Sequence, residues 1–149
     1  LGEKDYVFLS VFKWENRKGW EVLLDAYWSA FTRHDPVLLV LRCHVPSWEP
    51  GPSSVQQRLI DHARTPSKLR SELWRKTKKG SAGLPYPTKL EDLARIHVVA
   101  GGQGADQGSL SREEMRELYY SSDAFVLPTR GEGWGLPVVE AMAMQLPVI

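Results

Sequence analysis

The residues best suited to chemistry lie in a glycine-rich turn near the end of the chain, between two glutamates. Glu132 and Glu140 bracket the sequence Gly-Trp-Gly-Leu-Pro-Val-Val, and residues 131–135 include three glycines. A carboxylate only accepts hydrogen bonds, so each glutamate matches the paired hydroxyl donors of a sugar. Pro137 favours a helix that starts there, and the unpaired N–H groups of its first turn form an anion site. The pattern therefore predicts a cradle that suits a sugar nucleotide.

The rest of the chain predicts alternating strands and helices, and these elements must position the glycine-rich turn. An i, i+3, i+4 pattern from Trp20 to Phe31 predicts an amphipathic helix, and Ser111-x-x-Glu114 has the spacing of a capping box that opens another. Strands alternating with helices predict an α/β fold with a doubly wound, Rossmann-like parallel sheet. The predicted strands are residues 6–12, 37–41, 96–100 and 124–127, and a fifth begins at 147–149.

The first and fourth strands should be neighbours at the point where the winding of the sheet reverses. In a sheet of order 3-2-1-4-5, ligands bind at the carboxyl ends of these two strands. The crevice would then lie between residues 13–19 and residues 129–140. Lys13, Arg17 and Lys18 place cations opposite the anion cradle. We expect the two lysines to contact the ligand and Arg17 to lie at the surface.

These two motifs resemble a known family, the GT-B glycosyltransferases of the glycosyl transferases group 1 type. The resemblance rests on Glu-x7-Glu enclosing Gly-Trp-Gly-Leu-Pro, and on the spacing of Lys13 and Lys18-Gly19. It covers residues 6–19 and 111–149 and hardly touches residues 46–89, which we predict to be a helical insertion. It implies that the residues of the donor site are Lys13, Lys18, Thr129, Glu132, Gly133, Trp134, Gly135, Leu136 and Glu140.

In that family the first glutamate meets the donor sugar and the second meets the ribose hydroxyls, while backbone amides between them meet the phosphate. Carried over, Glu132 orients the sugar, Glu140 anchors the ribose, and Lys13 and Lys18 stabilise charge on the leaving diphosphate. Two departures are Lys13, where arginine is commoner, and Trp134, where phenylalanine is commoner. Lysine lacks the bidentate fork of arginine, so the geometry of diphosphate binding should differ.

The resemblance implies the C-terminal, nucleotide-sugar-binding half of a retaining, metal-independent glycosyltransferase of the hexosyltransferase type. Its donor would be a UDP- or GDP-sugar, and it would need no cofactor. We expect residues 1–149 to form a single domain of a longer chain, incomplete at its C-terminus. The N-terminal acceptor domain of the family would be missing, so we expect no sugar transfer by this chain alone.

Composition excludes several other classes. The net charge of +1 gives no field that would attract nucleic acid, and the single cysteine, Cys43, excludes an internal disulfide. No Asp-x-Asp pair occurs and the histidines lack metal spacing, so no metal site is predicted. No apolar run is long enough to span a membrane, and we expect a soluble, cytoplasmic protein. The basic run Lys68–Lys79 leaves peripheral membrane contact open, although we interpret it as a solvated helix face.

Two alternatives remain. A nucleotide-binding module without catalysis would use Glu140 and the lysines but not Glu132. An NAD(P)-binding oxidoreductase domain would instead use the glycine-rich loop after the third strand, which contains Gly102, Gly104 and Gly108. The spacing of these glycines departs from the dinucleotide fingerprint, and the loop follows a strand away from the expected switch point.

Overall fold

The fold is a parallel sheet with helices on both faces. The computed structural model describes residues 4–76, 80, 82–83, 85–99 and 109–149. Within them the sheet has four parallel strands in the order β3-β2-β1-β4. The strands are β1 (Tyr6–Lys13), β2 (Val37–His44), β3 (Ile96–Val98) and β4 (Ala124–Phe125). The predicted fold class and strand order are confirmed.

A fifth strand position is visible only as a single parallel bridge in the described residues. Val148 pairs with Phe125, and the Ile149 N–H donates to the Phe125 carbonyl at 2.9 Å. The chain therefore turns back beside β4 and places β4 inside the sheet, as the predicted order requires.

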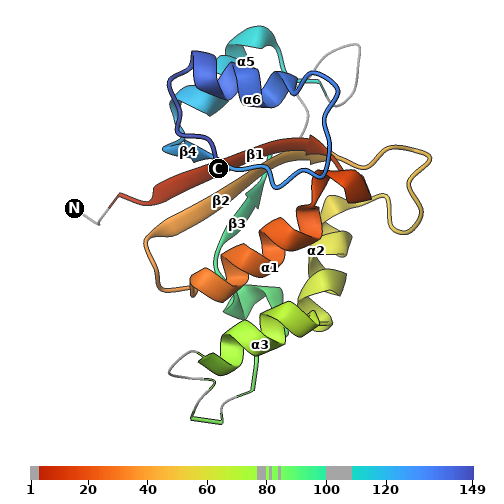
Figure 1. Cartoon of the computed structure of the whole chain (residues 1–149), viewed down its shortest axis with the longest axis vertical. Helices are drawn as coiled ribbons and strands as arrows, with labels where there is room; N and C mark the ends of the chain where they lie inside the picture. Colours follow the sequence, from red (N-terminus) through yellow and green to blue (C-terminus); the bar gives the residue numbers. More distant parts are fainter. Residues whose placement is uncertain (1–3, 77–79, 81, 84, 100–108) are drawn as a thin grey trace.

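Helices cover the two faces of the sheet unequally (Figure 1). On one side lie α1 (Trp20–Ala30), α2 (Val55–Arg64) and α3 (Lys68–Lys76). On the other lie α5 (Arg112–Tyr120) and α6 (Leu136–Ala143). Two short 3-10 helices, η1 (Asn16–Lys18) and η2 (Leu90–Asp92), complete the described elements.

Aromatic contacts fix both helix layers against the strands. The Phe8 ring lies 6.3 Å from Tyr27 of α1, and the Tyr119 ring of α5 lies 6.1 Å from Phe125. The sequences of the strands are nearly continuous apolar runs, because helices cover both faces of a parallel sheet. Leu9, Leu39, Leu41 and Phe125 are accordingly buried without exposure.

The helix starts follow the sequence signals. Ser111 accepts from the Glu114 N–H at 3.1 Å, and the Glu114 carboxylate accepts from the Ser111 N–H at 2.7 Å, which forms the predicted capping box. Ser54 caps α2 by accepting from the Gln57 N–H at 3.3 Å. The helix predicted to start at Pro137 begins one residue earlier, at Leu136.

The helices α2 and α3 of the middle segment are held to α1 by a buried arginine. Arg70 has no exposed surface; its Nε lies 3.4 Å from Asp25 Oδ1, and its guanidinium lies over the rings of Trp28 and Tyr86. Burial alone would raise the pKa of Asp25, but hydrogen bonds and charges, chiefly from His62, outweigh it and lower that pKa. The interpretation of the basic run as a solvated face was therefore wrong for Arg70, because a carboxylate on α1 and two rings compensate its burial.

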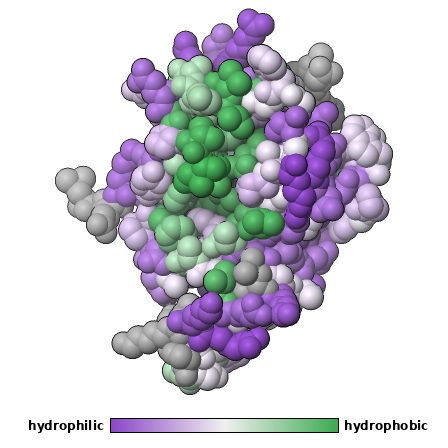
Figure 2. Space-filling view, viewed as in Figure 1, coloured by the Kyte–Doolittle hydropathy of each residue, from purple (hydrophilic) through white to green (hydrophobic). Residues whose placement is uncertain are grey.

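One face of the molecule is unusually apolar. Figure 2 shows hydrophobic side chains gathered on the face that carries α6 and the end of the chain in Figure 1. The exposed apolar residues of these elements are Leu136, Val139, Met142, Val148 and Ile149. A patch of this kind is typical of a contact surface.

No described helix is both long and apolar enough to cross a membrane.

The loop after β1 touches the loop after β4 at a glycine. Gly19 has a φ of +68°, and a Cβ added there would lie 2.0 Å from the Pro128 carbonyl oxygen. Only glycine fits this position, because a side chain would meet both left-handed backbone strain and a backbone atom. A side chain at position 19 would therefore force the two loops apart at this point.

We predict that Gly19→Ala lowers the free energy of unfolding by about 2–5 kcal/mol, from backbone strain and overpacking together. Urea unfolding followed by circular dichroism measures this change. The matched control is Gly83→Ala, since Gly83 has a φ of +78° but no atom of the described residues within 4 Å of the added Cβ. Gly83→Ala should lower the free energy of unfolding only by the backbone strain, about 1–2 kcal/mol. Equal losses in the two variants would contradict the close contact.

Candidate functional site

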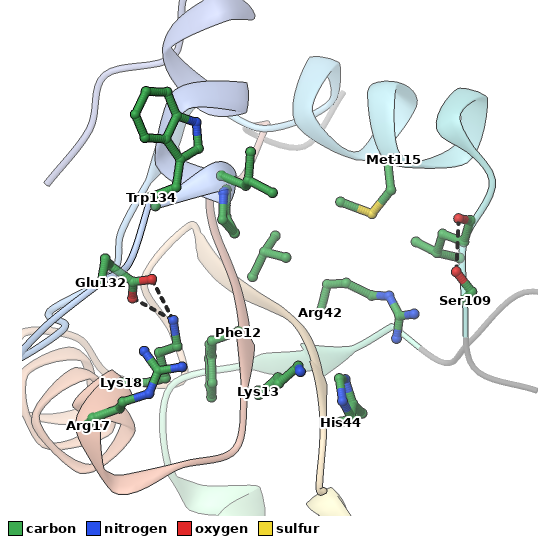
Figure 3. Close-up of a pocket in the computed structure, with 15 residues that line it drawn as sticks. Phe12, Lys13, Arg17, Lys18, Arg42, His44, Ser109, Met115, Glu132 and Trp134 are labelled. Atoms are coloured by element: carbon green, nitrogen blue, oxygen red, sulfur yellow. Dashed lines mark hydrogen bonds and ion pairs between the residues drawn. The ribbon is translucent and has the colours of Figure 1, made fainter.

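A pocket of about 450 Å³ opens at the carboxyl ends of β1 and β2, between η1 and the start of α6 (Figure 3). This is the predicted switch point of the sheet, where the loops after the first and fourth strands meet. The structure brings together residues that are more than 110 positions apart in the chain. The predicted site residues that line the pocket are Lys13, Lys18, Glu132, Trp134, Gly135 and Leu136.

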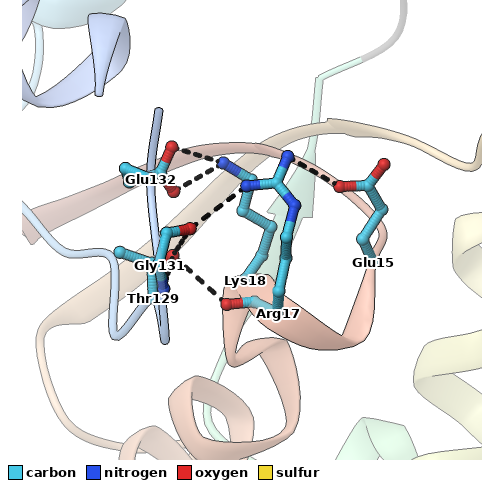
Figure 4. A network of polar contacts seen from close by, with 6 residues as sticks. All are labelled: Glu15, Arg17, Lys18, Thr129, Gly131 and Glu132. Carbon is cyan, nitrogen blue, oxygen red and sulfur yellow. Dashed lines mark hydrogen bonds and ion pairs between the residues drawn. The ribbon is translucent and has the colours of Figure 1, made fainter. Parts of the chain in front are cut away.

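Lys18 and Glu132 form an ion pair on one side of this pocket (Figure 4). Lys18 Nζ donates to Glu132 Oε1 at 2.5 Å and to Oε2 at 2.7 Å, and the two side chains are only 9% and 19% exposed. Burial alone would raise the pKa of Glu132, but hydrogen bonds from Lys18 and Thr129 and the charges of Lys18 and Arg17 lower it below its ordinary value. Glu132 is thus held as a carboxylate, in a fixed direction.

Further hydrogen bonds join the same two loops (Figure 4). Arg17 Nη1 donates to the Gly131 carbonyl at 3.1 Å, and the Arg130 N–H donates to the Arg17 carbonyl at 2.7 Å. Thr129 Oγ1 lies 3.2 Å from the Arg17 carbonyl and 3.0 Å from the Gly131 carbonyl. Arg17 is exposed, as expected, but also bridges the loops. Thr129 contributes to the pocket indirectly, by supporting Glu132.

The turn before α6 has the uncapped helix start on which the predicted anion cradle depends. Gly135 is the N-cap residue with a φ of 70°, and no side chain caps the helix. Within the described chain, the N–H groups of Gly135 and Leu136 have no backbone acceptor, while Pro137 has no N–H to satisfy. Unpaired donors at a helix N-terminus favour an anion. Gly133 belongs to this turn but does not line the pocket.

Glu140 lies in a neighbouring hollow of about 380 Å³ rather than in the first pocket. Its Oε2 accepts a hydrogen bond from the Tyr119 hydroxyl at 2.8 Å. Burial, together with this hydrogen bond and the carboxylate charge, raises the pKa of Tyr119, which therefore stays a donor. Leu110 and Met115 line both hollows, so the two adjoin. The two glutamates can therefore contact different parts of one extended ligand.

Trp134 and Lys13 are accessible residues of the pocket. Trp134 is 78% exposed, so its ring is available to a ligand rather than committed to the core. Lys13 Nζ lies 5.9 Å from the centre of the Trp48 ring, a weak cation–π contact that leaves the ammonium in the solvent. Neither residue needs to lose a strong contact before binding.

Sequence reasoning missed two basic residues of the pocket, Arg42 and His44 of β2. Burial, followed by the charges of Lys13 and Arg42, lowers the pKa of His44. A signal was present, because these residues alternate with Leu41 and Cys43 at the end of an apolar strand, and alternate residues share a face.

Other predicted features are not placed by the structure. Residues 100–108, which include the glycines of the dinucleotide alternative, lie outside the described residues. Among the residues that are described, no group of three or more histidines, cysteines or carboxylates could hold a metal ion. Independence from metal ions stays a prediction.

The parallel sheet, with a basic pocket and a helix N-terminus at its switch point, is an α/β Rossmann-like domain, and comparison with known proteins gives its similarities. The family model of glycosyl transferases group 1 matches residues 82–149. A solved C-terminal domain of a glycosyl transferase group 1 family protein from Francisella tularensis aligns with 97% of this chain and 57% of its own, with a TM-score of 0.53. At 20% identity this second likeness shows the fold alone.

Two curated relatives agree with the family model. A sulfoquinovosyl transferase of Arabidopsis thaliana is 38% identical over 65 residues, which cover 44% of this chain and 12% of that protein. A serotype-specific mannosyltransferase of Escherichia coli is 35% identical over 94 residues, covering 59% of this chain and 11% of that protein. The chain thus spans about a tenth of the length of these relatives. The match to the glycosyl transferases group 1 model is confined to residues 82–149, and the chain has the fold of the C-terminal domain of a GT-B glycosyltransferase.

We predict that Glu132→Gln destabilises the protein by about 2 kcal/mol at pH 7, because it leaves Lys18 buried without its counter-charge. Since folding lowers the pKa of Glu132, its contribution is present above the ordinary pKa of a glutamate. It is lost as the pH falls through the lower pKa of the folded protein. Urea unfolding at pH 7 and at pH 3 measures both effects.

The control for this prediction is Glu91→Gln, which removes an exposed carboxylate 4.0 Å from Lys89. An exposed pair of this kind contributes about 0–1 kcal/mol, so the variant should unfold almost as the unchanged protein does. If Glu132→Gln lowers the free energy of unfolding no more than the control does, the Lys18–Glu132 pair does not stabilise the junction, that is, the contact between residues 16–19 and residues 128–132.

Proposed function

We propose that this chain is the donor-binding domain of a retaining, metal-independent glycosyltransferase that takes its sugar from a nucleoside-diphosphate sugar. One observation carries the proposal. The uncapped N-terminus of α6, the Lys18–Glu132 pair and Lys13 all open onto one pocket at the switch point of the sheet. The N–H groups and the lysines could donate hydrogen bonds to a phosphate there. The Glu132 carboxylate beside them could accept a hydrogen bond from a sugar hydroxyl.

Each predicted residue has a role that fits its surroundings. Lys13 and the N–H groups of Gly135 and Leu136 would stabilise negative charge on the leaving diphosphate, which is electrostatic catalysis without a metal ion. Glu132 would orient the sugar. Both of its oxygens accept from Lys18, but each carboxylate oxygen keeps a second lone pair for a sugar hydroxyl.

Glu140 would anchor the ribose from the neighbouring hollow. The Tyr119 hydroxyl occupies Oε2 of this carboxylate, which leaves Oε1 for a ribose hydroxyl. A nucleotide that reaches from the cradle at Gly135 to Glu140 would pass the shared wall of the two hollows. The apolar Leu110 and Met115 of that wall suit the flat part of a nucleoside.

Neither the sugar nor the base follows from the family. The two relatives are named for sulfoquinovose and for mannose, so the same domain serves different donors. The short share of each relative that the chain spans makes transfer by this chain alone unexpected, because the acceptor must also be bound. Measurable transfer from a UDP- or GDP-sugar by the isolated chain would contradict that expectation.

One observation favours a second candidate, a nucleotide-binding module without catalysis. Glu132 already satisfies Lys18 inside the junction, so its carboxylate has a structural role that needs no sugar. Glu132→Ala and Glu140→Ala in the full-length gene product separate the two candidates. A transferase loses turnover in both variants, whereas a module loses nucleotide affinity only with Glu140→Ala.

Calorimetric titration of the chain with UDP, GDP, ADP and NAD tests the proposed function. We predict that one nucleoside diphosphate binds, and that Glu140→Ala and Lys13→Ala each weaken binding about tenfold or more, through loss of a ribose hydrogen bond and of a charged contact. The double variant Lys13→Ala/Lys18→Ala should bind no nucleotide at the concentrations used.

The control for the lysines is Lys89→Ala, which removes the same charge from an exposed position outside the pocket. It should bind with unchanged affinity. Circular dichroism of every variant verifies the fold, since loss of Lys18 also breaks the pair with Glu132. Preferential binding of NAD that survives loss of both lysines would overturn the proposal in favour of a dinucleotide site.

A further inference from the structure

We infer that Arg42 and His44 of β2, together with Lys13 of β1, form a phosphate-binding subsite of the pocket. The inference rests on the proposed function and refines it, because it names the residues that grip a phosphate group of the donor.

The register of the sheet places these three side chains on one wall. In the parallel pairing of β1 with β2, Val11 lies opposite Arg42 and Lys13 lies opposite His44. Alternate residues of a strand point to the same face, so all four share the face that carries the pocket. All four also line it. Figure 3 shows Lys13, Arg42 and His44 together, across the pocket from the Lys18–Glu132 pair.

The electrostatics of this wall favour an anion. Burial lowers the pKa of His44, and the charges of Lys13 and Arg42 lower it further, against a smaller opposite effect of Glu15. The two cations therefore produce a positive potential at the imidazole. An anion bound among the three groups would offset that potential and raise the pKa of His44.

Lys18 is less suited to be the main phosphate ligand than its position in the sequence indicates. Its ammonium already donates to both oxygens of Glu132, and its side chain is only 9% exposed. In this arrangement Lys18 is a positioning residue, because it fixes the direction of Glu132. The further basic side chains that line the pocket are Lys13, Arg42 and His44 on the facing wall.

The chemistry of the wall matches a phosphate group. The guanidinium of Arg42 presents a planar fork that fits two phosphate oxygens, which Lys13 cannot offer. His44 can donate one hydrogen bond when neutral and two when protonated. Arg42 would thereby supply the bidentate contact that a lysine at position 13 lacks.

Calorimetric titration with inorganic pyrophosphate, the group common to all nucleoside diphosphates, tests the inference directly. We expect Arg42→Gln to weaken pyrophosphate binding about tenfold or more and Arg42→Lys to weaken it less, because a point charge remains. The matched control is Arg64→Gln, which removes the same charge from α2 outside the pocket and should change affinity less than twofold.

A second measurement needs no variant of Arg42. Proton NMR of the histidine rings, assigned with His44→Gln, should show the pKa of His44 rising when pyrophosphate binds, while the ring signals of His34, which does not line the pocket, should keep their positions at a fixed pH. A merely structural role for His44 would leave its pKa where it is. Unchanged pyrophosphate affinity in a folded Arg42→Gln variant, or binding without any change in the titration of His44, would overturn the subsite.

Failure of the subsite is distinguishable from failure of the proposed function. If Lys13→Ala weakens nucleoside diphosphate binding while Arg42→Gln and His44→Gln do not, the subsite is wrong and the donor site stands. If the folded chain binds neither pyrophosphate nor any nucleoside diphosphate, both are wrong. Weakened binding in all three variants supports both.

Discussion

The close contact between the turn at residues 16–19 and the loop at residues 128–132 is the constraint on which the site depends. Gly19 packs against the Pro128 carbonyl, where the Cβ of any other residue would collide with the carbonyl oxygen. The Lys18–Glu132 ion pair also joins the two segments. Without the contact, the cations after β1 and the turn before α6 would belong to separate surfaces. The sheet order makes the two loops neighbours, and the glycine lets them touch.

The sequence predicted the parts of the structure that local rules determine. Strand order followed from the alternation of strands and helices, and the Ser111 capping box and the helix at Pro137 followed from short-range hydrogen bonding and fixed φ. The burial of Arg70 could not be predicted in this way, because its partner Asp25 lies on another helix. A charged residue in a basic run is ordinarily solvated, and only tertiary contacts reverse that expectation.

The candidate site was predictable as a list of residues but not as an arrangement. Lys13, Lys18 and Glu132 do meet in one pocket, but no local pattern indicated that Lys18 would pair with Glu132. Glu140 lies in the adjoining hollow, where Tyr119 holds it. These pairings depend on side-chain positions across more than one loop. They divide the charges into the Lys18–Glu132 pair, which fixes Glu132, and a group of basic residues, Lys13, Arg42 and His44, that line the same pocket.

The measurement that most directly tests the donor site is amide NMR of the isotopically labelled chain, titrated with the nucleoside diphosphate that binds. If the junction and the turn before α6 form the site, the largest shift changes should fall on Lys18, Gly19, Gly135 and Leu136. Amides of α2 and α3, on the other side of the sheet, should be unchanged. Changes concentrated on α2 and α3, with none at Gly135 and Leu136, would contradict a donor site at the switch point.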